Sequence, residues 1–268
     1  MDQFYTKPDI ALKYYEILKS IVDIDEYDIL LEPAAGKGAF FNLLPEERRQ
    51  GLDIEPKSEN IERMDYFDFI PEENLKYLVI GNPPFGKISS IAIKFFNKSA
   101  EFADIIAFII PRTFKRVSVQ NKLNLNFHLI YTEDLPLIPC CFEPKMGAKC
   151  CFQIWRKKNE LRDKIVFELS HPDFEFLPLG DKDDNNQPTP PNGADFVVKA
   201  YGSNCGEIRD YDLFELRPKS WHWIKSNIEV NILKNNIRHL DFSIARDTVR
   251  QDSIGHGEFI WLYKQKYY

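Results

Sequence analysis

The 268-residue sequence predicts an α/β protein with a doubly wound sheet, followed by a smaller carboxyl-terminal region. Three observations predict this fold class. Short apolar runs alternate along the chain with helix-like segments. Several of these runs lack polar alternation, which indicates strands covered on both faces. A glycine-containing turn follows the first apolar run directly, as expected where such a sheet carries a ligand.

The elements of the first domain are predicted in chain order. A helix is expected over residues 8–22, because Pro8 suits a first helical turn and apolar residues recur at near-helical spacing. A second helix is expected to open at 39–44, and a third to span 89–102 with Ser89 or Ser90 as its cap. The stretch 135–149 is expected to be a loop. Strands are expected at 28–32, 51–54, 76–80, 104–110, 127–131 and 150–155.

The composition changes near residues 181–193, which are rich in Asp, Asn and Pro and predict a solvated, mobile loop. The stretches 196–201 and 221–224 beyond it predict a small β-rich or mixed module. We therefore expect one domain at residues 1–160 and a second region at 161–268.

Composition excludes several classes of protein. An aromatic content of 14% argues against a disordered chain. No apolar run is long enough to cross a membrane, and the amino terminus lacks a secretory pattern, so we expect a cytoplasmic protein. The net charge is −6, yet residues 85–160 carry 12 Lys or Arg against 6 Asp or Glu. This basic segment could hold a phosphate backbone, or it could be a chance fluctuation of surface charge.

The cysteines do not predict a metal site. They occur as Cys140-Cys141, Cys150-Cys151 and a single Cys205, whereas structural zinc ligands are usually separated by two to four residues. We expect the two pairs to be small buried hydrophobic residues and predict no metal.

The first chemical motif runs from Glu32 to Gly38, at a turn from strand to helix. Its glycines allow the backbone to approach a ligand closely. Asp53, about twenty residues after Glu32, stands at the end of the next strand, where an acid can accept hydrogen bonds from ribose hydroxyls. The turn lacks the Gly-Lys-Ser/Thr ending of a phosphate-binding loop.

The second motif is Asn82-Pro83-Pro84-Phe85, directly after an apolar strand and bracketed by Gly81 and Gly86. The prolines stiffen the turn and leave carbonyl acceptors without neighbouring amide donors. The Asn82 side-chain oxygen beside such a carbonyl can accept both hydrogens of one amino group. The Phe85 ring offers a surface on which a base can stack.

Together these motifs resemble the S-adenosylmethionine-dependent amino methyltransferases, particularly those that act on N6 of adenine in DNA and place their cofactor motif before the catalytic motif. Further segments are similar to those of the family over residues 3–158: the amino-terminal Gln3 to Pro8, the acidic-aromatic Asp65-Tyr66-Phe67, the strand and loop 110–114, and the strand 151–155. The resemblance implies a Rossmann-like class I methyltransferase sheet in residues 1–160 and target recognition in 161–268.

The resemblance also implies a mechanism and a set of site residues. Asn82 and Pro83 would hold the adenine amino group, and Phe85, beside Pro84, would stack on a base flipped out of its helix. The cofactor S-adenosylmethionine would be bound by Tyr5, Thr6, Glu32, Pro33, Ala34, Gly36, Gly38, Asp53, Ile54, Asp65, Tyr66 and Asn82.

DNA is the expected partner, with RNA the weaker alternative. The residues expected to contact phosphates or base edges are Lys87, Arg112, Lys115, Arg116, Arg246 and Arg250, although the same charges would suit a solvated helix face or an ordered loop. Because the recognition region is short, it would read few bases or need a partner subunit or a homodimer. His128, His171 and His222 are expected to be structural.

Three other functions fit the same motifs. They are adenine methylation in RNA, methylation of a protein glutamine amide, and a non-catalytic nucleic-acid-binding module that keeps the fold. Phe85 favours nucleic acid over protein, and the co-occurrence of Glu32, Asp53 and Asn82 argues against a decayed site. Restriction-modification, phage self-protection and regulation all remain open as biological roles.

Overall fold

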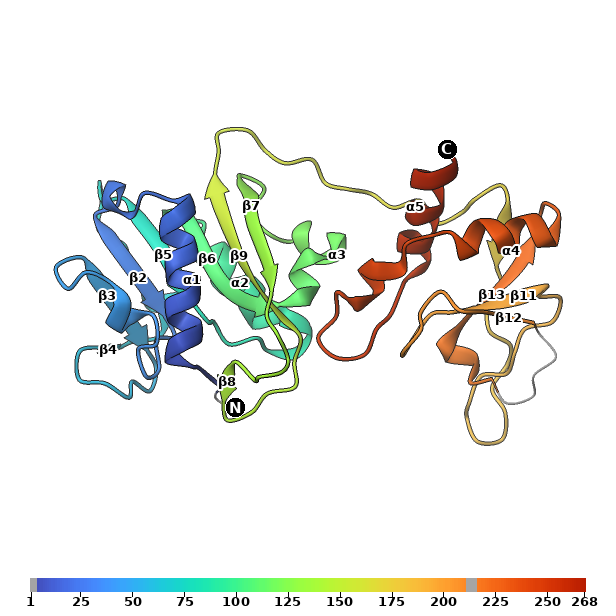
Figure 1. Ribbon diagram of the computed structural model, residues 1–268, viewed down its shortest axis with the longest axis horizontal. Helices are drawn as coiled ribbons and strands as arrows, with labels where there is room; N and C mark the ends of the chain where they lie inside the picture. Colours follow the sequence, from blue (N-terminus) through green and yellow to red (C-terminus); the bar gives the residue numbers. More distant parts are fainter. Residues whose placement is uncertain (1–3, 211–215) are drawn as a thin grey trace. The chain divides into compact units, whose positions relative to one another are not determined.

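The computed structural model describes residues 4–210 and 216–268 (Figure 1). The chain divides into two compact units, Met1–Lys164 and Ile165–Tyr268, and each unit has its own sheet and buried core. Within the described ranges, no helix has both the length and the apolar character that a bilayer crossing requires.

The amino-terminal unit is built on a seven-stranded sheet in the order β4-β3-β2-β5-β6-β9-β7 (Figure 1). Strands β2 to β6 pair in parallel, and β9 runs antiparallel to both of its neighbours. The strand order reverses between β2 and β5. The predicted doubly wound, Rossmann-like sheet is therefore confirmed. The strands are β2 (Ile29–Pro33), β3 (Arg49–Asp53), β4 (Glu62–Arg63), β5 (Tyr77–Gly81), β6 (Ala103–Pro111), β7 (Phe127–Asp134) and β9 (Cys150–Lys157).

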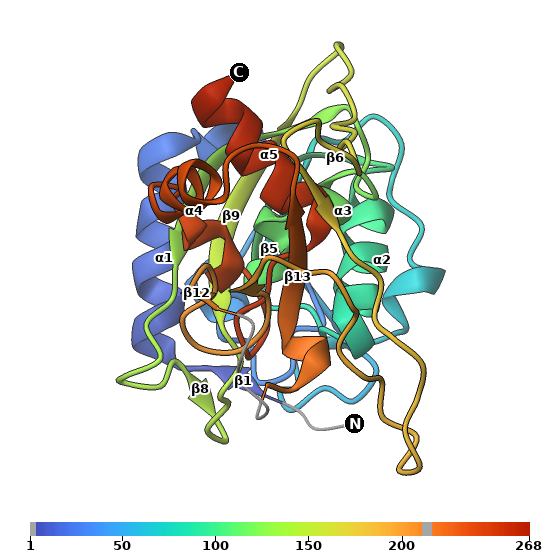
Figure 2. The ribbon, with the colours of Figure 1, turned by 90° about the vertical axis from the view of Figure 1, so that its right-hand side faces the viewer.

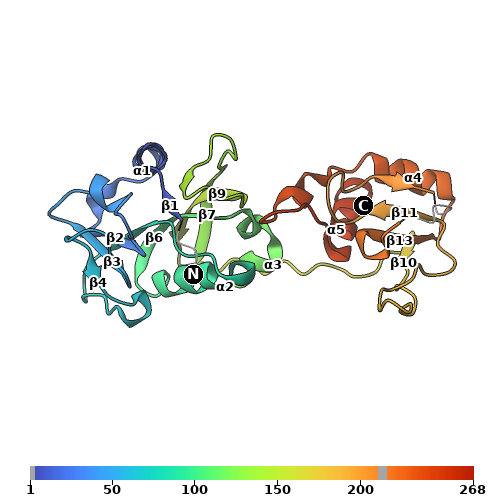
Figure 3. The same ribbon diagram turned by 90° about the horizontal axis from the view of Figure 1, so that it is seen from below.

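Helices cover both faces of this sheet, with α1 (Pro8–Ile21) on one side and α2 (Ser90–Ser99) on the other (Figures 2 and 3). The apolar strands have no polar face because both faces are buried. Alternate residues of β6 enter the two cores: Ile105, Ala107 and Ile109 on the α1 side, and Ile106, Phe108 and Ile110 on the α2 side.

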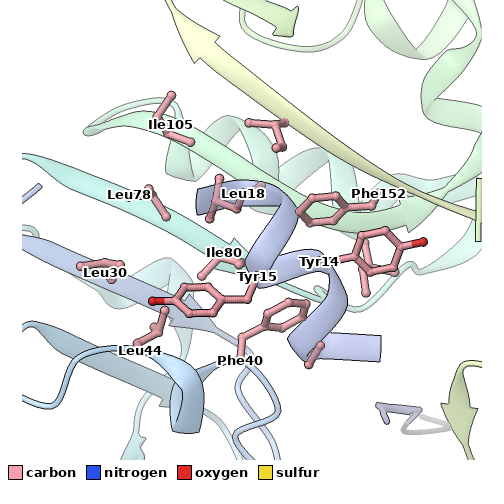
Figure 4. Close-up of a cluster of buried hydrophobic side chains, with 14 of the residues drawn as sticks. Tyr14, Tyr15, Leu18, Leu30, Phe40, Leu44, Leu78, Ile80, Ile105 and Phe152 are labelled. Atoms are coloured by element: carbon pink, nitrogen blue, oxygen red, sulfur yellow. The ribbon is translucent and has the colours of Figure 1, made fainter. Parts of the chain in front are cut away.

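Helix α1 is fixed to the sheet by its buried face (Figure 4). The Tyr14 ring stacks on Phe152 of β9 with 4.6 Å between ring centroids, and Leu18 is fully buried among strand residues. Burying such a side chain stabilises the fold by about 1.5–3 kcal/mol. The short strand β1 (Tyr5–Thr6), which immediately precedes α1, is thereby positioned as well.

Two predicted elements differ from the structure. The helix expected at 39–44 is a single 3₁₀ turn, Phe41–Leu43, because Gly38 has a left-handed backbone (φ +76°) before it and Pro45 follows it. The expected loop 135–149 contains a short strand, β8 (Phe142–Glu143), which pairs with β1. A short helix, α3 (Val117–Gln120), was not predicted.

The carboxyl-terminal unit has an antiparallel sheet in the order β10-β13-β11-β12, with two helices packed on one face. The prediction of a small mixed module is confirmed. The segment 181–193 is largely exposed and is closed by a bridge between Lys182 and Pro188. The elements are β10 (Phe174–Phe176), β11 (Phe196–Lys199), β12 (Ile208–Arg209), β13 (Trp221–Ser226), α4 (Val230–Arg238) and α5 (His256–Tyr267).

Candidate active site

The carboxyl ends of β2, β3 and β5 meet at one edge of the seven-stranded sheet, beside the point where the strand order reverses. Open α/β sheets bind their ligands at such an edge. A small pocket lies there, and it brings together five of the predicted site residues: Tyr5, Thr6, Glu32, Ala34 and Asn82. We call it the active-site pocket.

The turn after β2 is folded tightly enough to need unusual backbone angles. Gly36 and Gly38 have φ values of +54° and +76°, which glycine adopts readily. Ala34 also has a left-handed φ of +56°, a strain of about 1–2 kcal/mol for an L residue. A Cβ atom on Gly36 would lie 2.8 Å from the Tyr5 ring. Glycine at this position therefore lets the amino-terminal segment close over the turn.

Glu32 places a buried acid at the base of the pocket. Burial raises the pKa of its carboxyl group to about 8, and nearby Asp53 acts in the same direction, while the backbone amides of Phe41 and Phe40 oppose the shift. The Glu32 Oε2 atom accepts a 2.6 Å hydrogen bond from the Phe41 amide. Among the described residues no cationic side chain pairs with Glu32. Without a ligand the Glu32 carboxyl group therefore keeps its proton near neutral pH, and a cationic group of a ligand would favour its ionised form.

Asp53 ties the turn to the end of β3. Its Oδ2 atom accepts a 2.7 Å hydrogen bond from the Gly36 amide, and its Oδ1 atom accepts one of 2.7 Å from the Glu55 amide. Each carboxylate oxygen has a second lone pair, so Asp53 can still accept hydrogen bonds from a ligand. The neighbouring Ile54 side chain is 68% exposed and offers an apolar surface at this edge.

The amino-terminal segment closes the pocket from above the turn. Strand β1 pairs with β8, and the Lys7 amide donates a 3.0 Å hydrogen bond to the Cys141 carbonyl. The Thr6 hydroxyl is buried in the pocket wall and has no hydrogen-bond partner in the described part of the chain. Gln3, the first residue of the segment named from the sequence, lies outside the described residues.

Asn82 is oriented by the same segment. Its Nδ2 atom donates a 3.3 Å hydrogen bond to the Phe4 carbonyl oxygen. Because a carbonyl can only accept, this contact assigns the nitrogen to Phe4 and leaves the Asn82 Oδ1 atom as a free acceptor among the described residues. Pro83 is buried directly after it, and neither Pro83 nor half-buried Pro84 has an amide hydrogen. The turn thus combines an orientated amide oxygen with backbone carbonyl oxygens.

The remainder of this turn is held by backbone geometry and one hydroxyl pair. Gly86 has φ +69°, and a Cβ atom there would lie 2.5 Å from Ile91. Phe85 is half-buried against the α1-side core, and its carbonyl accepts a hydrogen bond from the Ile91 amide. Ser89 is buried with φ +59°, and its hydroxyl lies 2.7 Å from that of Thr113, which links the turn to the loop after β6.

Asp65 and Tyr66, predicted to contact the cofactor, do not line the active-site pocket. Tyr66 is buried in the α2-side core, and its hydroxyl lies 2.7 Å from that of Ser99. Asp65 instead accepts a hydrogen bond from the Phe67 amide and caps a 3₁₀ turn. The adjacent Phe67 ring is 42% exposed.

The predicted phosphate contacts of the amino-terminal unit are partly engaged within it. Arg112 Nε lies 3.4 Å and Lys115 Nζ 2.7 Å from Asp134 carboxylate oxygens, so this acid offsets both charges. Lys87 is exposed on the turn after Phe85, and Arg116 is half-buried. In the carboxyl-terminal unit, Arg246 and Arg250 are exposed.

No metal site is apparent among the described residues, where no cluster of three His, Cys, Asp or Glu side chains forms. Cys141, Cys150 and Cys151 are buried, as predicted, whereas Cys140 is only half-buried. His222 is also buried, where its Nε2 atom contacts the Ile254 carbonyl.

The polar groups in and beside the pocket suit those of S-adenosylmethionine, although the cavity itself, about 20 Å³, is too small to enclose the cofactor. The ammonium and sulfonium groups of the cofactor suit Glu32, its ribose hydroxyls suit Asp53, which lies beside the pocket, and its carboxylate suits the unpartnered Thr6 hydroxyl. Glu32, Asp53 and Thr6 are therefore the residues that would hold it.

Four pocket residues were not predicted as site residues: Phe4, Ala35, Lys37 and Ala39. Phe4 lines the pocket and orients Asn82 through its carbonyl oxygen, a contact across 78 positions of sequence that no local pattern indicates. Lys37 lies in the glycine turn and places its Nζ atom 4.7 Å from the centroid of the Tyr5 ring. Its position within the motif was the available signal.

Comparison with known proteins gives only distant likenesses. No family model and no curated protein matches the sequence. Among solved structures, the RNA methyltransferase candidate PH1948 of Pyrococcus horikoshii is 18% identical over 58% of this chain and 87% of its own, with a TM-score of 0.44. A Thermoplasma acidophilum protein, 1320, is 16% identical over 58% and 89%, with a TM-score of 0.42. The 23S rRNA methyltransferase ErmE is 14% identical over 59% and 71%, with a TM-score of 0.43. These scores are too low to bear on function, so the site is interpreted from its own residues.

Proposed function

We propose that this protein transfers a methyl group from S-adenosylmethionine to the N6 amino group of an adenine in a nucleic acid. DNA is the substrate that the motif order favours. The observation that carries the proposal is the orientation of Asn82. Its amide nitrogen is held by the Phe4 carbonyl, so its oxygen is free to accept a hydrogen bond beside the active-site pocket.

The hydrogen-bond acceptors of this turn would make an exocyclic amino group more nucleophilic. The lone pair of that nitrogen is delocalised into the adenine ring, which makes it a poor nucleophile. The Asn82 Oδ1 atom and the Pro83 carbonyl oxygen would accept hydrogen bonds from the two N–H groups of the adenine amino nitrogen. These hydrogen bonds would localise the lone pair on that nitrogen. Acceptors held in place before the reaction cost no reorganisation when charge develops.

The cofactor, when bound, supplies a methyl carbon activated by a sulfonium sulfur. The amino nitrogen forms a bond to this carbon as the carbon–sulfur bond breaks, and the nitrogen then loses one proton to solvent. Glu32 and Asp53 would orient the donor, while Asn82 and Pro83 orient the acceptor. Most of the rate enhancement would come from this positioning.

Phe85 would stack on the target base after it leaves its helix. An amino group inside a stacked duplex is out of reach, and unstacking costs a few kcal/mol that contacts in the pocket must offset. The ring is half-buried at the margin of the α1-side core.

Transfer of radiolabelled methyl groups from S-adenosylmethionine tests the function. The purified chain is incubated with duplex DNA, single-stranded DNA, RNA or protein, and the labelled product is digested and identified. We expect N6-methyladenine from a nucleic acid, a loss of product with Asn82→Ala, and full activity with Asn231→Ala, which removes an exposed asparagine of α4. Label in protein alone would overturn the proposal.

A further inference from the structure

The carboxyl-terminal unit contains a second pocket, larger than the first, to which the proposed reaction assigns no role. Its volume is about 380 Å³, which lies within the range of about 300–1,000 Å³ typical of small-molecule sites. It is lined by the chain after β10, the end of β11, strand β13, and the segment leading into α5. We call it the aromatic pocket. The residues that matter to its chemistry are Tyr201, Lys219, Trp221, His222 and His256.

Two of its walls present flat rings to a ligand. Tyr201 follows β11 and is 48% exposed although it lines a concave surface. His256 opens α5, and its imidazole stacks on Phe176 with 4.0 Å between centroids and 4° between planes. These two rings come from separate segments of the chain. Rings of this kind are the usual surfaces on which unpaired bases stack.

The pocket also offers a defined hydrogen-bond acceptor. His222 is 7% exposed, and its Nε2 atom lies 3.0 Å from the Ile254 carbonyl oxygen. A carbonyl accepts only, so Nε2 carries the hydrogen. Burial lowers the pKa of His222 to about 3, helped by His256, so the ring stays neutral and Nδ1 remains an acceptor. No hydrogen bond to this Nδ1 is found among the described residues.

The charged side chains around the pocket favour an anionic ligand over a cationic one, although Glu207 pairs with one of them, Arg209. Lys219 lines it, whereas no Asp or Glu side chain of the described residues does. The Lys199 ammonium lies 5.4 Å and the Arg209 guanidinium 5.2 Å from the centroid of the Trp221 ring. A quaternary ammonium group would be repelled here, but the phosphate of a nucleotide would be attracted.

We propose that the aromatic pocket binds one unpaired nucleobase of the nucleic-acid strand, stacked against Tyr201 and His256, with an amino group donating to His222. The inference rests on the proposed function for the identity of the strand. It assigns to the carboxyl-terminal unit a substrate contact of its own, remote in sequence from the methylation motifs. The backbone phosphate of that nucleotide would lie near Lys219.

Fluorescence anisotropy with a labelled single-stranded oligonucleotide of mixed sequence, as DNA and as RNA, tests the pocket in the full chain. We expect Tyr201→Ala to weaken binding about 10-fold, the loss typical of one stacked base, and Tyr201→Phe to bind like the unaltered chain. Tyr268→Ala is the matched control, since this tyrosine is 73% exposed and lies outside the pocket. Comparison of the DNA and RNA oligonucleotides shows which of the two nucleic acids the chain binds more strongly.

Cross-linking locates the base directly. An oligonucleotide carrying 5-iodocytosine, which keeps the amino group that the proposal requires, is irradiated with the protein, and the modified peptide is identified by mass spectrometry. We expect modification of Tyr201 or His256. A cross-link confined to other peptides, or equal affinity of Tyr201→Ala and the unaltered chain, would overturn the proposal.

The outcomes separate this inference from the proposed function. Methyl transfer to nucleic acid together with unaffected binding by Tyr201→Ala would overturn the base pocket alone. Weakened binding by Tyr201→Ala with no methyl transfer by the unaltered chain would overturn the proposed function and support the pocket. A chain that methylates nucleic acid but binds neither oligonucleotide would overturn the base pocket alone.

Discussion

The two pockets of this protein differ in how their chemistry is assembled. The active-site pocket is built around a buried carboxylate and backbone turns, and most of its functional groups come from two contiguous motifs. The aromatic pocket has no acidic lining side chain among the described residues, and its rings come from segments between Tyr201 and His256. The difference supports the two proposals, a cationic cofactor at the first pocket and an anionic strand at the second.

The largest expected effect is that of Asn82→Ala on turnover. Removing one preorganised transition-state contact typically lowers kcat by about 10²–10³-fold. Cofactor affinity should change little, because Glu32 and Asp53 remain. Single-turnover kinetics combined with calorimetry separates the two quantities, and Tyr201→Ala should show the opposite pattern, with strand binding weakened and the chemical step retained. Equal loss of cofactor binding and turnover in Asn82→Ala would contradict its assigned role.

Glu32 should make the stability of the amino-terminal unit depend on pH. Between its ordinary pKa of 4.5 and its folded-state pKa of about 8, the unfolded chain is ionised while the folded chain keeps the proton. Stability present at low pH is therefore lost as pH rises, by about 1.4 kcal/mol per unit. Urea unfolding at pH 6, 7 and 8 measures this slope, and Glu32→Gln should lack it. Parallel pH profiles for the two proteins would show that the carboxyl group is not protonated.

Asp53→Ala should weaken S-adenosylmethionine binding by on the order of 10- to 100-fold, the value of hydrogen bonds to a charged group. Asp183→Ala is the matched control, because its carboxylate also accepts two backbone hydrogen bonds, from Asn185 and Gln187, but on the exposed segment 181–193. Calorimetry should show unchanged cofactor affinity for the control. Unchanged affinity for Asp53→Ala would remove this residue from the cofactor site.

The smallest expected effect is on stability, when each of two glycines with left-handed backbones is replaced by alanine. Gly193→Ala should cost about 1–2 kcal/mol of stability, because φ is +86° and nothing lies within 4 Å of the new Cβ atom. Gly36→Ala has the same backbone strain and in addition a Cβ atom 2.8 Å from the Tyr5 ring, which should add about 1–3 kcal/mol. Urea unfolding measures both. Equal losses would mean that Tyr5 does not press on the turn.

The sheet could be predicted from the sequence because its signal is local. The strand β6 is apolar at nearly every position, since both of its faces are buried, and the turn residues after β2 and β5 stand next to their strands. The prediction of a helix at 39–44 was wrong for two reasons. The Phe41 amide donates to the Glu32 carboxylate, and the flanking Gly38 and Pro45 leave space for only one turn.

The missed parts of the sites depend on contacts that no spacing encodes. The Phe4 carbonyl oxygen accepts its hydrogen bond from Asn82 because α1 packs on the sheet and so positions the segment before it. Adjacent Tyr66 and Phe67 look alike in sequence, yet Tyr66 is buried in the core and Phe67 is half-exposed. Arg112, which is predicted to contact phosphate, lies near Asp134 at the end of β7, a contact that its place in the sequence does not indicate. The aromatic pocket has no motif, because its rings meet only after the carboxyl-terminal unit folds.

A crystal structure of the chain with sinefungin, a non-reactive analogue of the cofactor, tests the central claim most directly. We predict that the amino-acid part of the analogue lies beside Glu32 and Thr6, that its ribose contacts Asp53, and that its amine, in place of the methyl donor, points toward Asn82. Density for the analogue in the aromatic pocket, or anywhere away from the carboxyl ends of β2 and β5, would contradict the account.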